Sequence, residues 1–369
     1  MPSSSVSPRH SRPLPALALA VLLAACEKKP APVEASPDAT ARTSAPAVAS
    51  AAPSPAADAG VVAVSGEASP WRWDCSAPFV PRSGKSVGHT SVVFKLELED
   101  GTKVAWKPNA KRVKNRYKGE IAAYRLAEAL GVAANVIPAC ATVIDANAAA
   151  AALRSNPAAA KLLADEVIAE DGKIYGARMP WVDGLRFWPL EKDPLRAEAR
   201  SWLTAGTTIP KDKVELARQT STLVAFDFVT GNWDRYSGEN VGIVDADHGG
   251  VVGPPPSHPT EGPEAGKSDR MRVLYVDNDA AFMEGAPKDR LGWNKAMLEK
   301  TDRFSRSFVA AARTLDEKRL ASVFGEEAPG RLLLAPAVVR TVAARIEELL
   351  SIVDGKIATR GEAETLYFE

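Results

Sequence analysis

Residues 226–235 decide the fold: Phe226-Asp227-Phe228-Val229-Thr230-Gly231-Asn232-Trp233-Asp234-Arg235. One carboxylate, Asp234, follows an apolar helical pattern, and an acid or an amide, Glu239 or Asn240, lies five or six residues later. A second carboxylate, Asp277, ends a predicted strand. This order supplies a base for a hydroxyl group, a ligand for one metal ion and a carboxylate that bridges metal and phosphates. The stretch therefore predicts phosphoryl transfer, with solvated turn acids as the alternative.

Three upstream segments match other parts of a phosphoryl-transfer site. Residues 83–90 contain Gly84 and Gly88, which would let backbone N–H groups approach phosphates closely. Lys107 ends a predicted strand and would point its ammonium into a cleft between two lobes. Glu120, at the start of a predicted helix, could reach Lys107 as an ion pair that holds the amine at a nucleotide's phosphates. Taken singly, each has a plain alternative: an ordinary loop, a surface lysine, and a first-turn glutamate that favours the helix dipole.

Together these segments resemble the atypical kinases related to the secretory-pathway kinases (the Golgi casein kinase and four-jointed group), to HipA and to the type II phosphatidylinositol kinases. The resemblance covers roughly residues 80–355 and is carried by Lys107-Pro108, Glu120-Ile121-Ala122-Ala123-Tyr124, Val136-Ile137-Pro138, Asn232-Trp233-Asp234-Arg235 and Asp277-Asn278-Asp279-Ala280-Ala281-Phe282. It implies that Lys107 contacts the phosphates of ATP and that Glu120 holds Lys107. It also implies that Asp234 is the catalytic base and that Asp277 ligates Mg²⁺ or Mn²⁺.

The sequence departs from the family pattern at two places. Family members with asparagine usually carry it five residues after the aspartate, but Glu239 stands there and Asn240 follows it. Either residue could ligate the metal. Asp279 replaces a common glycine and adds a carboxylate that either binds metal or faces solvent.

Strand patterns come first along the chain and helical patterns later. Alternating residues over 90–98 and 102–106 flank a turn at 99–101 and predict a hairpin. Helical spacing predicts a helix over 118–130 that ends at Gly131. Further strands are predicted over 136–144, 173–182, 241–244 and 271–276, and further helices over 145–170, 191–230 and from 287 onward, ending with one near 336–355.

We therefore expect an α+β, two-lobed protein-kinase-like fold. The small β-rich N-lobe spans residues 71–182, and the larger helical C-lobe spans 183–360 with an exposed Pro/Gly-rich loop over 249–266. Residues 364–369 resemble a degenerate protease tag and are left out of this prediction.

The first seventy residues indicate export and a tether. A basic head precedes a short apolar run that ends at Cys26, so residues 1–26 are predicted to be a secretory signal. The cysteine resembles that of a bacterial lipobox, in which Cys26 is lipidated; a plain signal peptide is the alternative. Residues 27–70 are rich in Ala and Pro and predict a disordered tether. We expect a cell-envelope lipoprotein, exported from the cytoplasm and held at the outer membrane through Cys26.

Composition narrows the remaining function classes. The chain of 369 residues has 46 basic and 46 acidic side chains, which argues against a polybasic nucleic-acid binder. Its apolar content of 46% excludes a wholly disordered protein. After Cys26 is lipidated, Cys75 and Cys140 remain and could form a disulfide in an oxidising compartment.

The sequence thus predicts an exported, membrane-tethered atypical kinase that transfers the γ-phosphate of ATP to a hydroxyl group of a protein or glycan acceptor. A lipid or small-molecule kinase on the same fold is the nearest alternative, because the nucleotide residues do not report the acceptor. A nucleotide-binding pseudokinase is the second alternative, because the altered spacing of Glu239 and Asn240 after Asp234 would be expected if the protein had lost its catalytic activity.

Overall fold

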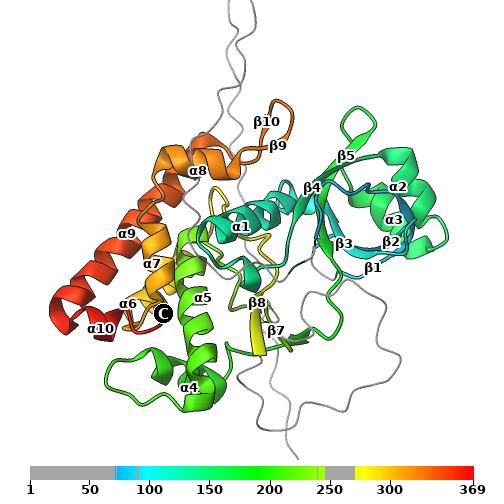
Figure 1. The fold of residues 1–369 in the computed structure, drawn as a ribbon. Coiled ribbons are helices and arrows are strands. Elements are labelled where there is room, and N and C mark those ends of the chain that lie inside the picture. The colour runs from blue at the N-terminus through cyan, green and yellow to red at the C-terminus, as the bar shows by residue number, and fades with distance from the viewer. Residues whose placement is uncertain (1–70, 72, 89–90, 239, 246–270) are drawn as a thin grey trace, which may run out of the picture. The chain divides into compact units, whose positions relative to one another are not determined.

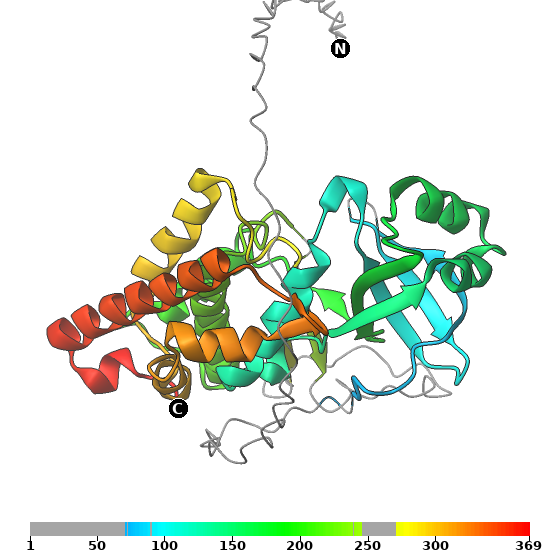
Figure 2. The same ribbon diagram turned by 90° about the horizontal axis from the view of Figure 1, so that it is seen from above.

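The computed structural model describes residues 71, 73–88, 91–238, 240–245 and 271–369. The predicted signal with Cys26, the tether, Glu239 and the loop over 249–266 lie outside these residues. The described chain forms a β-rich lobe and a helical lobe, with helix α1 (Tyr117–Ala129) between them (Figures 1 and 2). The expected α+β, two-lobed architecture is therefore confirmed.

The N-lobe is a five-stranded antiparallel sheet in the order β1-β2-β3-β5-β4. Its strands are β1 (Pro81–Ser86), β2 (Phe94–Leu98), β3 (Lys103–Pro108), β4 (Cys140–Asp145) and β5 (Lys173–Pro180). The predicted hairpin is β2–β3, and its turn contains Gly101 with a φ of +83°. Helices α2 (Ala146–Leu153) and α3 (Pro157–Glu166) pack beside β1. Their apolar faces share a core with Phe94 and Trp106, which are fully buried.

The predicted helix over 145–170 is two helices, because Asn156 caps a new helix with Pro157 in its first turn. The predicted strand over 136–144 begins only at Cys140, and Val136 instead bridges Tyr275 in the C-lobe. Cys75 and Cys140 are joined by a disulfide, with their Cα atoms 5.4 Å apart, as the sequence had suggested. The disulfide ties the segment before β1 to the edge strand β4.

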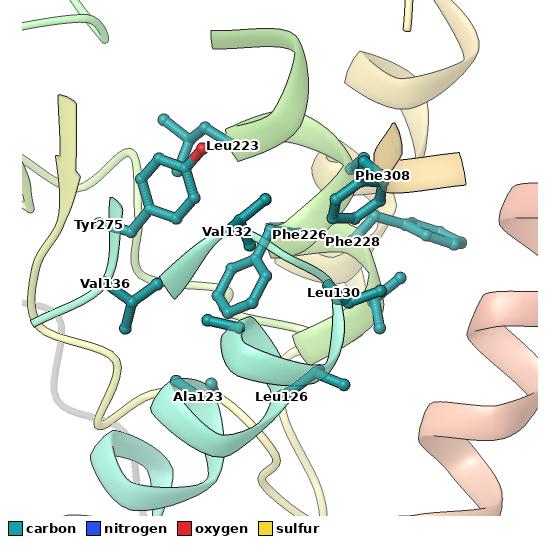
Figure 3. Close-up of a cluster of buried hydrophobic side chains, with 14 of the residues drawn as sticks. Ala123, Leu126, Leu130, Val132, Val136, Leu223, Phe226, Phe228, Tyr275 and Phe308 are labelled. Atoms are coloured by element: carbon teal, nitrogen blue, oxygen red, sulfur yellow. The ribbon is translucent and has the colours of Figure 1, made fainter. Parts of the chain in front are cut away.

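The C-lobe is built around α5, which is buried along most of its length. Its helices are α4 (Leu195–Leu203), α5 (Val214–Thr230), α6 (Lys288–Glu299), α7 (Arg306–Ala312), α8 (Glu317–Phe324), α9 (Pro336–Arg360) and α10 (Glu362–Thr365). Figure 3 shows Phe226 and Phe228 of α5 in the core shared by α1 and the C-lobe helices.

Two small sheets complete the lobe. Strands β6 (Arg186–Phe187), β7 (Val241–Asp245) and β8 (Met271–Tyr275) form the first, and β9 (Glu326–Ala328) and β10 (Arg331–Leu332) form the second. Single 3₁₀ turns lie at Lys111–Val113, Ala133–Asn135 and Lys211–Lys213. No helix in the described part of the chain is long and apolar enough to cross a membrane.

Residues 364–369 belong to the fold, and the expectation that they are a tag outside it is wrong. Thr365 and Phe368 are buried. The backbone N–H of Phe304 donates to the carbonyl of Thr365 at 2.7 Å, and Ser305 forms a parallel bridge with Phe368. The C-lobe therefore extends beyond residue 360.

Helix α1 joins the two lobes. Its inner face, including Ile121 and Leu126, is fully buried in the C-lobe core, while the helix also contacts β5. Gly119 permits this close packing, because a Cβ atom at that position would lie 2.4 Å from the carbonyl oxygen of Asn278. This approach brings the first turn of α1 against the segment that follows β8.

Candidate active site

Lys107 is the centre of a charge cluster drawn from three elements. Its Nζ lies 2.5 Å from Oε1 of Glu120 on α1 and 2.6 Å from Oδ1 of Asp277, which follows β8. Oδ2 of Asp279 is 3.5 Å away. The structure thus brings together three predicted site residues that are as far as 170 positions apart in the sequence.

Burial and charge oppose each other in this cluster. Burial acts to lower the pKa of Lys107, but the carboxylates of Asp277, Glu120 and Asp279 raise it well above its usual value, so the amine stays charged. Burial raises the pKa of Glu120 despite the neighbouring amine. Burial also acts to raise the pKa of Asp277, but Lys107 outweighs it and lowers that pKa. The side chain of Asp277 is 37% exposed, which leaves it open to a ligand.

Glu120 does more than pair with Lys107. Its second oxygen accepts a hydrogen bond from the backbone N–H of Asn278 at 3.1 Å. Asp277, immediately before Asn278, has a φ of +55°, an uncommon backbone conformation for a residue other than glycine. Glu120 therefore fixes both the amine and the turn that carries Asp277.

Arg235 is a buried anchor that sequence reasoning did not assign. Its Nε donates to both carboxylate oxygens of Asp227 at 3.0 Å. Its two terminal nitrogens donate to the carbonyl of Asn240 at 2.6 Å, to Oδ1 of Asn278 at 2.6 Å and to the carbonyl of Val276. Burial raises the pKa of Asp227 to about 6, against the opposing effect of Arg235. A single carboxylate between two phenylalanines of a helix is the sequence signal that points to such a buried pair.

Asp234 lies beside this anchor. Its side chain is partly exposed, and no described residue donates a hydrogen bond to its carboxylate. Asn232 connects Asp234 to Asp277: its Oδ1 accepts from the N–H of Asp234 at 3.3 Å, and its Nδ2 donates to the carbonyl of Asp277 at 3.3 Å. The side-chain amide of Asn240 donates to the carbonyl of Asp234 at 2.7 Å. The structure thus links Asp234 through Asn232 to the turn that carries Asp277, and the carboxylate of Asp234 accepts from none of the described residues.

The two predicted phosphate-loop glycines have different surroundings. Gly84 lies within β1, and a Cβ atom there would be 2.4 Å from Cδ2 of Leu96, so core packing accounts for this glycine. Gly88 follows β1, and its N–H donates to the carbonyl of Val93 at 3.4 Å. From the same connection, Oγ of Ser91 donates to Oδ2 of Asp279 at 2.7 Å. The loop between β1 and β2 therefore contacts the site through Ser91, a residue not predicted from the sequence.

The donor set fits a hard divalent cation that is bound together with phosphates. Within the described ranges, no group of three or more His, Cys, Asp or Glu side chains could hold a metal ion by itself. Mg²⁺, however, is usually held by one or two carboxylates and by the oxygens of its substrate. Asp277 offers such a carboxylate. The side-chain N–H groups of Asn240 donate to the carbonyl of Asp234 and to Oγ of Ser237, and no described residue donates to its amide oxygen.

Comparison with known proteins identifies the fold. No family model and no curated protein sequence matches the chain. A crystal structure of the Golgi casein kinase with Mn/ADP bound has a TM-score of 0.53 at 14% identity, covering 78% of this chain and 75% of that one. A second crystal structure of the Golgi casein kinase has a TM-score of 0.50 at 15% identity and the same coverage. The structure of hydra Fam20 with sugar follows, with a TM-score of 0.48 at 14% identity over 76% of this chain and 87% of that one.

The chain therefore has the kinase-like fold of the Golgi casein kinase. The expected resemblance to the atypical secretory-pathway kinases is confirmed at the level of the fold.

Proposed function

We propose that this chain is an atypical kinase that transfers the γ-phosphate of ATP to a hydroxyl group of a protein or glycan acceptor. The observation that carries the proposal is the contact of one buried amine, Lys107, with Glu120 at 2.5 Å and with Asp277 at 2.6 Å. The fold is shared with a kinase crystallised with Mn and ADP, which supports nucleotide and divalent-metal binding here.

Each residue then has a role that follows from its position. Lys107 binds the α- and β-phosphates, and Glu120 holds the amine in place. Asp277 and Asn240 would hold a Mg²⁺ or Mn²⁺ ion, which when bound neutralises charge on the β- and γ-phosphates. Asp234, whose carboxylate accepts no hydrogen bond from the described residues, takes the proton of the acceptor hydroxyl. Positioning and charge stabilisation supply most of the catalysis in such a site.

We also propose that the protein is exported and tethered to the cell envelope through lipidated Cys26. The disulfide between Cys75 and Cys140 supports this location, because disulfides persist in oxidising compartments. Cys26→Ser should move the protein from the membrane fraction to the soluble fraction and abolish labelling with a fatty-acid analogue. Unchanged membrane association of Cys26→Ser would refute the tether.

The kinase proposal is tested with the full chain and labelled ATP in the presence of Mg²⁺ or Mn²⁺. Panels of proteins, glycans and lipids serve as acceptors. Transfer to a protein or glycan hydroxyl supports the proposal, whereas transfer to lipids alone would make the protein a lipid kinase. Binding of nucleotide and metal without turnover on any acceptor would make it a pseudokinase.

A further inference from the structure

Arg116 is a cationic residue at the edge of the site, and none of the roles proposed above involves it. It is the residue before α1, and its side chain is only 16% exposed. Its guanidinium lies 3.5 Å from Oδ1 of Asp279, and its Cζ lies 5.4 Å from the centre of the Trp233 ring. An N-lobe side chain therefore reaches the C-lobe segments that carry Asp277 and Asp234.

The guanidinium is held in place but keeps most of its donors. Arginine offers five N–H donors, and Asp279 is the only acidic partner of Arg116 among the residues that the structure describes. Their separation of 3.5 Å exceeds the roughly 2.7–2.9 Å of a good charge-assisted hydrogen bond. Trp233 supports the guanidinium through its ring face, which uses none of the donors. The arrangement leaves Arg116 able to bind an anion.

Helix stability does not explain an arginine at this position. Anions, not cations, are favoured near the N-terminus of a helix, and the side chain of Arg116 makes no capping hydrogen bond. Other cations of the same segment contact groups away from the site: Lys111 donates to the carbonyl of Asp165, and Arg112 lies 3.8 Å from Glu166.

Asp279 lies close to both Arg116 and Lys107. Its Oδ2 accepts from Ser91 and lies 3.5 Å from Lys107, while its Oδ1 faces Arg116. Asp279 is two residues after the proposed metal ligand, and Trp233 is the residue before the proposed base. The guanidinium therefore contacts both the segment that carries the proposed metal ligand and the segment that carries the proposed base.

We propose that Arg116 is a further catalytic residue that contacts the transferring γ-phosphoryl group, with Asp279 and Trp233 as its positioning residues. This inference rests on the proposed kinase function. In the transfer, the bond from the γ-phosphorus to the β,γ-bridging oxygen breaks, and its electron pair leaves with ADP. The acceptor oxygen forms the new bond to phosphorus, and its proton passes to Asp234. The planar guanidinium of Arg116 then stabilises negative charge on the equatorial oxygens of the transferring phosphoryl group.

The test compares wild type, Arg116→Ala and Arg116→Lys, with Arg112→Ala as the matched control from the same segment. Affinities are measured for Mg·ADP alone and for Mg·ADP with aluminium fluoride, which mimics the transferring phosphoryl group. We expect Arg116→Ala to weaken binding of the mimic roughly 10²–10³-fold, the effect of removing one transition-state donor, while Mg·ADP affinity stays within a few fold. kcat should fall by a similar factor with little change in the KM for ATP.

Arg116→Lys keeps the charge but lacks the planar fork, so it should lose an intermediate factor. Arg112→Ala should match wild type in every measurement. Equal affinity of wild type and Arg116→Ala for the mimic, or an equal loss for the mimic and for Mg·ADP, would overturn the role of Arg116. A wild type that binds the mimic but transfers no phosphate would overturn the proposed function alone, because the affinities still decide on Arg116. A wild type that binds no nucleotide would overturn both.

Discussion

Replacing Arg235 with methionine should destabilise the protein more than any other single charge removal that we predict. The Arg235 side chain is fully buried, and the Asp227 side chain is 2% exposed. Arg235→Met therefore leaves a buried carboxylate without its cation, a change that typically costs about 3–5 kcal/mol. Protonation of Asp227, whose pKa burial already raises to about 6, keeps the cost at pH 7 from exceeding this range. We expect a loss of about 3–5 kcal/mol in the free energy of unfolding.

The assay is urea denaturation of the full chain at pH 7 for Arg235→Met, Asp227→Leu and the double variant. Because each single variant strands the other charge, the double variant should lose less than the sum of the singles, by about 1–3 kcal/mol. Arg313→Met is the matched control: its partner is Asp354, both side chains are about half exposed, and such surface pairs contribute about 0–1 kcal/mol. A cost below about 1 kcal/mol for Arg235→Met, or losses that add within about 0.5 kcal/mol, would refute the reasoning.

Three further predictions concern the packing, the disulfide and the pH dependence. Gly119→Ala should weaken nucleotide binding about tenfold or more, because its methyl group would collide with the carbonyl of Asn278 and push Glu120 away. Gly355→Ala, with open space around it, should bind nucleotide as wild type does. Equal nucleotide affinities of the two variants would contradict the role of Gly119 in positioning Glu120. Replacing both Cys75 and Cys140 with serine should lower the free energy of unfolding by about 4 kcal/mol, the loop-closure value for a separation of 65 residues; insensitivity of urea unfolding to reductant would argue against it. Since the folded state raises the pKa of Asp227 from 3.8 to about 6, it binds this proton more tightly than the unfolded state. The contribution of Asp227 to stability should therefore fall by about 2 kcal/mol as pH rises from about 4 to about 7. Asp227→Asn should lack that fall, and identical pH profiles of the two proteins would exclude it.

The sequence predicts those site residues that can be recognised from the local pattern around them and from their order along the chain. A lysine at a strand end, a glutamate in the next helix and an aspartate after a late strand are each readable from local pattern, and the structure joins all three at Lys107. The β2–β3 hairpin is equally local, because Gly101 provides the turn conformation.

Contacts made by tertiary packing are not readable in this way. Nothing in the local pattern shows that Ser91 reaches Asp279, 188 residues later, or that Arg116 lies over Trp233. At Gly84 the local pattern suggests a role that packing explains instead. A glycine near a loop suggests phosphate binding, but Gly84 is required because a Cβ atom there would collide with Leu96. A pattern reports which residues are suited to a role, but only the fold decides which partners they meet.

The kinase proposal is tested most directly by the rate of phosphate transfer in Asp234→Asn. This change keeps the shape of the side chain and removes only the base. We expect the rate to fall roughly 10²–10⁴-fold, the usual effect of a positioned general base, while Mg·ADP affinity is retained. Asp289→Asn, an exposed acid at the start of α6, should keep the wild-type rate. Wild-type turnover by Asp234→Asn would contradict the account.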